Sequence, residues 1–131
     1  MFKIKPIIDH IRAMLPKRLS SKLPREIGVV LLKPEESAKL NMIYRNKNKA
    51  TNVLSFNYGS DYGEILICPE IVKKEAKEAG NTQVFQMTWM MVHGMIHLSE
   101  LHHEKSQVAD GEFAKLEGKI LSQIFKKKPR V

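Results

Sequence analysis

The sequence contains a single cysteine, Cys68, so no disulfide can form within the chain. A lone cysteine suits a reducing compartment, and we expect a cytoplasmic protein. No apolar run approaches the ~20 residues that span a bilayer, and the most hydrophobic stretch, residues 88–96, contains a histidine. Charged side chains at Lys3, Lys5 and Arg12 interrupt the N-terminal apolar residues, so we expect no signal peptide. These absences exclude a disulfide-stapled domain and a transmembrane protein.

Acidic residues are also scarce, with 14 Asp and Glu against 22 Lys and Arg, which leaves a net charge of +8. Such a surplus favours a polyanionic partner, either nucleic acid or an anionic membrane face. Nucleic acid is the preferred interpretation, because phosphate contacts account for most sequence-independent affinity for RNA and DNA. A basic protein that is merely soluble is the alternative. Residues 126–131, with four Lys and Arg, form a basic tail that fits phosphate contact or a solvated chain end.

The 131 residues predict one domain that spans the whole chain, 1–131. Apolar periodicity and turn residues predict both helices and short strands. The predicted helices cover residues 6–19 with a break near Pro16, 34–44, 71–79, 83–98 and a last segment after 110. The predicted strands cover residues 26–32, 51–56 and 64–68, the first of them as a buried strand. This order predicts an α+β fold, in which a small mixed sheet packs with helices.

The predicted helix 83–98 carries the most informative residues of the chain. It is apolar almost all round, which is typical of a helix buried at the centre of a domain. His93 and His97 lie four residues apart on it, so both imidazoles share one face, one turn apart. Two ring nitrogens presented in this way can hold a divalent metal, and a buried helix gives them a rigid scaffold. Packing of two histidines that bind nothing is the alternative.

A third histidine, His103, follows six residues after His97, far enough for the chain to leave the helix and turn back. Three His ligands with an open fourth position are typical of a catalytic zinc, whereas a structural zinc closes its shell with four protein ligands. We therefore predict one zinc per chain, held by His93, His97 and His103. Imidazole also suits nickel, copper and iron, so the metal stays open at this point. His102, directly before His103, competes with it for the place of the third metal ligand. The fifth histidine, His10, is expected at the surface.

Three ordered blocks carry a resemblance to a known family. His93-Gly94-x-x-His97-Leu98, followed by His103, resembles the metal-binding signature of the YbeY-type endoribonucleases. Upstream, residues 44–47 (Tyr-Arg-Asn-Lys) and 51–56 (Thr-Asn-Val-Leu-Ser-Phe) are similar to the second block of that family. Residues 62–67 resemble the strand that follows. The chain departs from the family pattern at Glu100, where the family has Gly, and at His102 and Asn52, where it has Asp.

The resemblance implies a single-strand-specific, metal-dependent endoribonuclease that acts in rRNA maturation and in quality control of the small ribosomal subunit. It implies RNA as the partner, with no membrane and no DNA, and a bacterial cytoplasm as the location. It makes Arg45 a catalytic candidate, because a guanidinium can pair with phosphoryl oxygens that gain negative charge. His97 is the second catalytic candidate. The family also has about four strands, which would place one more strand at residues 1–5.

Two other functions remain open. The histidine spacing matches that of metzincin proteases, but those carry a Glu as general base directly after the first His, and this chain has Gly94 there. A metalloprotease is therefore less favoured. The other function is that of a ribosome-assembly RNA-binding protein that keeps a metal for stability, which the substitutions at Glu100, His102 and Asn52 would suit.

Overall fold

The computed structural model describes residues 4–99 and 107–125, and it contains a mixed β-sheet packed with helices. Strands β1 (Glu26–Leu31), β2 (Val53–Asn57) and β3 (Tyr62–Ile67) form a sheet in the order β1-β3-β2. β1 pairs with β3 in parallel, and β2 and β3 form an antiparallel hairpin. The predicted α+β fold with a small mixed sheet is confirmed.

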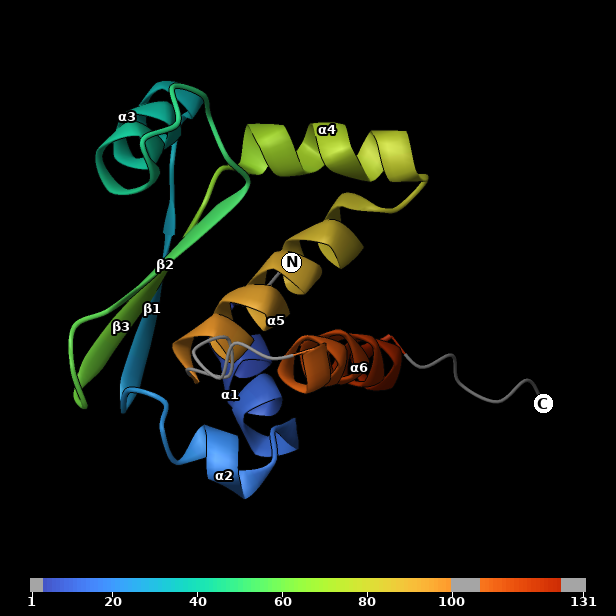
Figure 1. The fold of residues 1–131 in the computed structure, drawn as a ribbon. Coiled ribbons are helices and arrows are strands. Elements are labelled where there is room, and N and C mark those ends of the chain that lie inside the picture. The colour runs from blue at the N-terminus through green and yellow to red at the C-terminus, as the bar shows by residue number, and fades with distance from the viewer. Residues whose placement is uncertain (1–3, 100–106, 126–131) are drawn as a thin grey trace.

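The described part of the chain also contains six helices, and most of them lie on one side of the sheet. Figure 1 shows α4, α5 and α6 on that side, with α3 at the far end of the sheet. Their bounds are α1 Ile4–Met14, α2 Lys17–Ser20, α3 Pro34–Arg45, α4 Pro69–Ala79, α5 Gln83–Leu98 and α6 Gln107–Ile124. Among the described residues, no helix combines the length and the apolar character needed to cross a membrane.

Helix α5 is the centre of the core, as its composition predicts. It contacts β2 and β3 of the sheet as well as α1, α4 and α6, and ten of its sixteen residues are buried. Its fully buried side chains meet those of β3, where Ile65 and Ile67 are also fully buried. A polar helix could not occupy this position, because each unpaired polar group would lose its hydrogen bonds to water.

Local chemistry explains where the helices begin and end. Thr82 caps the N-terminus of α5, because its hydroxyl oxygen accepts a hydrogen bond from the backbone N–H of Phe85 at 3.1 Å. Gly80 ends α4 in the left-handed conformation at φ 74°, which costs glycine little. Pro16 separates α1 from α2, where a break was predicted.

Two expectations about the sheet are wrong. Residues 26–32 were expected to form a buried strand, but β1 lies at the sheet edge and leaves Val30 37% and Leu31 53% exposed. A run of β-branched residues predicts a strand but does not say whether it is covered on both faces. A fourth strand was expected at residues 1–5, yet Ile4 already belongs to α1, and residues 1–3 lie outside the described part of the chain.

Candidate metal centre

Helix α5 brings the side chains of His93 and His97 together, as their spacing predicts. Their ring centroids are 4.5 Å apart at an interplanar angle of 67°, and the Nε2 atoms of the two rings approach to 3.0 Å. Both side chains are only partly buried. Two imidazole nitrogens therefore converge on one point at the edge of the core, where a small ligand can reach them.

This convergence fits a shared metal ion. Two nitrogens bound to one tetrahedral zinc, each at about 2.0–2.1 Å, lie roughly 3.3 Å apart, which is close to the observed 3.0 Å. Without a metal, one ring must donate an Nε2 proton to the other, because two lone pairs would otherwise face each other. The donor set of neutral imidazoles suits zinc and its neighbours in the first transition row. His93 and His97 can thus supply two ligands.

Glu117 of α6 fixes the other side of the His93 ring. Its Oε2 atom lies 2.7 Å from His93 Nδ1 and accepts a hydrogen bond from the indole Nε1–H of Trp89 at 3.2 Å. The Glu117 side chain is 16% exposed and that of His93 is 35% exposed. A carboxylate at Nδ1 favours the proton on that nitrogen, which leaves the lone pair on Nε2, the atom that faces His97.

Phe113, one turn before Glu117 on α6, covers the pair. Its ring centroid lies 5.0 Å from that of His93 and 5.0 Å from that of His97. Phe113 and Glu117 lie four residues apart on α6, as His93 and His97 do on α5. The aromatic ring and the carboxylate of α6 therefore face the two imidazoles of α5. An apolar wall limits the water around the rings and reduces the number of positions that they can adopt.

Gly94 lets α5 lie close to the sheet beneath the histidines. A Cβ atom at this position would meet the side chain of Ile65 on β3 at 2.9–3.0 Å, well inside ordinary van der Waals contact. The residue after His93 is therefore restricted by packing as well as by chemistry. A Glu at this position, as metzincins require, has no room toward the sheet.

A pocket of about 540 Å³ opens beside His93. Its walls come from β2, α4, α5 and α6, and they include Asn52, Glu75, Trp89 and Glu117. Asn52 Nδ2 donates to both carboxylate oxygens of Glu75, at 3.0 and 3.3 Å. Asn52 and Val53 of the second sequence block therefore border the same pocket as His93.

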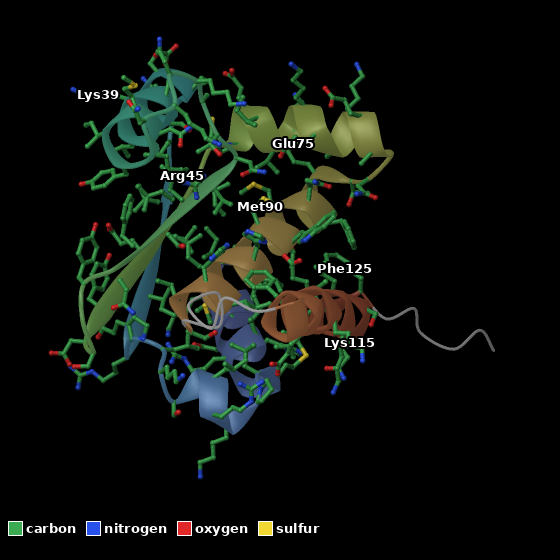
Figure 2. The ribbon with its side chains drawn as sticks, in the orientation of Figure 1. Lys39, Arg45, Glu75, Met90, Lys115 and Phe125 are labelled. Carbon is green, nitrogen blue, oxygen red and sulfur yellow. The ribbon has the colours of Figure 1, made fainter. Side chains whose placement is uncertain are left out.

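The other predicted site residues are Arg45 and His103. Arg45 is exposed at the C-terminal end of α3 and is not among the residues that line the pocket beside His93 (Figure 2). His103 lies outside the described residues, as do His102 and Glu100. Within residues 4–99 and 107–125, no group of three or more His, Cys, Asp or Glu side chains is arranged to hold a metal. The third ligand thus stays a prediction.

Sequence reasoning missed Glu117, Phe113 and the role of Trp89. One signal was available for Glu117, because it lies three residues before Ile120 and four after Phe113, within the apolar stripe of its helix. A carboxylate in an apolar stripe needs a partner, since burial of an unpaired charge is costly. The sequence does not say which partner the helix will meet.

Comparisons with known proteins agree with the three sequence blocks. The family model described as Endoribonuclease YbeY matches residues 1–125. The protein named Endoribonuclease YbeY from Bdellovibrio bacteriovorus is 35% identical over 105 residues, which are 79% of this chain and 70% of that protein. The protein of the same name from Acinetobacter baylyi is 32% identical over an alignment of 137 positions, which covers 96% of this chain and 81% of that protein.

A solved structure extends the similarity to the fold. The solution structure of TM1509 from Thermotoga maritima superposes with a TM-score of 0.59 at 24% identity, and the match covers 95% of this chain and 85% of that one. The match of the family model to residues 1–125 and the identities with curated relatives lead to one conclusion. The chain belongs to the Endoribonuclease YbeY family.

Proposed function

We propose that this protein is a zinc-dependent endoribonuclease that cleaves single-stranded RNA during rRNA maturation and ribosome quality control. The observation that carries the proposal is the approach of His93 Nε2 to His97 Nε2 at 3.0 Å, with Glu117 at the opposite nitrogen of His93. Membership of the family supports the endoribonuclease activity itself. RNA of the small ribosomal subunit and a cytoplasmic location belong to the same proposal.

His93, His97 and His103 would hold one zinc ion per chain. Bound zinc activates water for attack on phosphorus and polarises a phosphoryl oxygen. The chain's own contribution is to orient the imidazoles. Glu117 holds the Nδ1 proton of His93, and the Phe113 ring limits the movement of both imidazoles. His97 is the residue whose loss should abolish the reaction.

Arg45 is the proposed phosphate-binding cation. The Tyr-Arg-x-Lys block of the family supports this role, and the exposed guanidinium is free of the desolvation cost that a buried cation would have. A guanidinium can donate two parallel hydrogen bonds to phosphate oxygens. Because Arg45 ends α3 rather than lining the pocket, it would contact RNA that extends away from the histidine pair.

The position after His93 supports a nuclease over a peptidase. A peptidase with this histidine spacing needs a Glu where Gly94 stands, and the neighbouring Ile65 side chain would crowd even a Cβ atom there. Phosphodiester cleavage does not depend on a carboxylate at that position. The basic surface, with a net charge of +8, also suits RNA better than a peptide.

A ribosome-assembly RNA-binding protein with a structural metal is the second candidate. The observation that favours it is the hydrogen bond from Asn52 to Glu75, because an amide stands where the family pattern has a carboxylate. The two candidates differ in one outcome. If the protein is an enzyme, its His97→Ala variant would lose RNA cleavage and still bind RNA. If it is a binding protein, the parent chain itself would show no metal-dependent cleavage.

Elemental analysis of the purified protein, without chelators, tests the proposed ligands. We expect about one zinc per chain in the parent, a loss in His93→Ala and His103→Ala, and retention in His102→Ala. His10→Ala is the matched control, because His10 is an exposed histidine on α1. Absence of metal from the parent would refute the catalytic proposal. Loss in His102→Ala instead of His103→Ala would move the third ligand by one residue.

A further inference from the structure

Four aromatic rings line the face of the hairpin that points away from α5. Ile65 of β3 faces α5, so its neighbour Glu64 faces the other way, and Phe56 pairs with Glu64 across the hairpin. Tyr58 and Tyr62 extend this outer face toward the hairpin loop. We call Tyr44, Phe56, Tyr58 and Tyr62 the aromatic face.

The rings of the aromatic face form a continuous series that solvent can reach. Successive centroids lie 4.7 Å apart from Tyr44 to Phe56, 6.4 Å from Phe56 to Tyr58, and 5.9 Å from Tyr58 to Tyr62. The last two rings are nearly parallel, at 10°. Tyr44 is 61% exposed, Tyr58 62% and Tyr62 38%. Packing of the hydrophobic core does not explain why these aromatic side chains lie exposed in a row.

Glu64 and Gly28 hold the tyrosine rings in place. The hydroxyls of Tyr58 and Tyr62 donate to the two carboxylate oxygens of Glu64, each at 3.0 Å. A Cβ atom at Gly28 would lie 2.5 Å from the Tyr62 hydroxyl oxygen, so the glycine on β1 leaves room for that ring. Rings that are ordered before binding lose less conformational entropy when a ligand stacks on them.

Cations adjoin one end of the aromatic face. Arg45 follows Tyr44 directly, and Lys47 and Lys49 lie in the next turn of the chain; all three are exposed. Asn41 anchors that turn, because its carbonyl oxygen accepts from Lys47 N at 3.4 Å and its Nδ2 donates to Lys49 O at 2.9 Å. The arrangement combines stacking surfaces with positive charge, the two features by which proteins bind single strands.

We propose that the aromatic face stacks unpaired bases of single-stranded RNA while Arg45, Lys47 and Lys49 contact its phosphates. Bases are uncharged, so the carboxylate of Glu64 does not repel them as it would repel a phosphate. In duplex RNA the bases are already stacked and paired, so they cannot reach the rings. The aromatic face therefore selects single strands. This inference rests on the proposed function in that RNA is the substrate, and it does not depend on the metal.

Binding of a short unstructured RNA and of a duplex of the same length, without metal, tests the aromatic face. We expect Tyr58→Leu with Tyr62→Leu to weaken single-strand binding by roughly 5- to 150-fold for each ring lost, and to leave duplex binding unchanged. Tyr58→Phe with Tyr62→Phe keeps the rings and should bind as the parent does. Val84→Ser, which removes an exposed apolar side chain from α5, should also bind normally.

Three outcomes would overturn the inference. In the first, the leucine variants keep full single-strand affinity. In the second, they lose single-strand and duplex binding equally. In the third, they keep RNA binding but lose self-association, which would make this face an interface between copies of the chain. Thermal unfolding of each variant confirms that it is folded. A failure of RNA cleavage in the parent would count against the proposed function alone, because the binding comparison needs no turnover.

Discussion

Replacing Gly94 by Ala tests the close packing of α5 on the sheet. The added Cβ atom would meet the Cγ2, Cδ1 and Cγ1 atoms of Ile65 at 2.9, 3.0 and 3.0 Å. Ile65 is fully buried and belongs to the middle strand of the sheet, so its side chain cannot swing into solvent. Gly118→Ala is the matched control, because this exposed glycine on α6 has nothing within 4 Å of the added atom.

The magnitude follows from two opposing contributions to the free energy of unfolding. Ala in place of Gly stabilises a helix interior by about 1 kcal/mol, and this gain is shared by both variants. Overpacking of a core costs about 1–3 kcal/mol, and only Gly94→Ala incurs it. We therefore expect Gly94→Ala to be about 1–3 kcal/mol less stable than Gly118→Ala. For a chain of this size the difference corresponds to roughly 3–15 °C in melting temperature.

Chemical denaturation of both variants measures this difference, and a shortened neighbour identifies its cause. In an Ile65→Ala background the clash disappears, so Gly94→Ala should there become as favourable as Gly118→Ala. Equal stability of the two single variants would refute the packing argument. If Gly94→Ala lowers the free energy of unfolding by the same amount in the Ile65→Ala background, the Ile65 side chain is not the one that Gly94 accommodates.

Three further predictions concern the cap, the carboxylate and the hairpin. Thr82→Ala should lower the free energy of unfolding by about 0.5–2 kcal/mol with Thr82→Ser near the parent, as measured by denaturation. Glu117→Ala should weaken zinc affinity by roughly 10- to 100-fold and alter the ¹⁵N shifts of His93 in the metal-free protein; unchanged affinity and shifts would count against its orienting role. The hydrogen bond to Glu64 raises the pKa of Tyr62 above its usual 10.0, so the stability it contributes is present below about pH 10 and is lost as pH rises through the raised pKa. Glu64→Gln should bring that pKa down in an NMR titration, and no change would contradict the cause.

Local signals predicted much of this fold. The apolar character of residues 83–98, with Thr82 before them, predicted α5 with the bounds that the structure has. The spacing of His93 and His97 predicted their proximity, because a helix fixes the positions of residues four apart. The predicted strands 51–56 and 64–68, with the turn-rich residues 57–63 between them, predicted the hairpin of β2 and β3. Each of these features depends on residues that are close in the sequence.

The remaining features depend on tertiary packing. The pairing of Glu117 with His93 joins residues 24 positions apart and follows from the way α6 lies on α5. The exposure of β1 follows from its place at the sheet edge, which its own residues do not determine. The aromatic face likewise requires the register of β2 against β3, and a shift of one residue would move Phe56 to the inner face.

RNA cleavage by the zinc-loaded parent and by His97→Ala is the most direct test of the central claim. We expect the parent and the His10→Ala control to cleave single-stranded RNA. We expect His97→Ala to bind the same RNA with similar affinity and not to cleave it. Cleavage that survives in His97→Ala, or a zinc-loaded parent that binds RNA without cleaving it, would contradict the assignment of the histidine pair as the reaction centre.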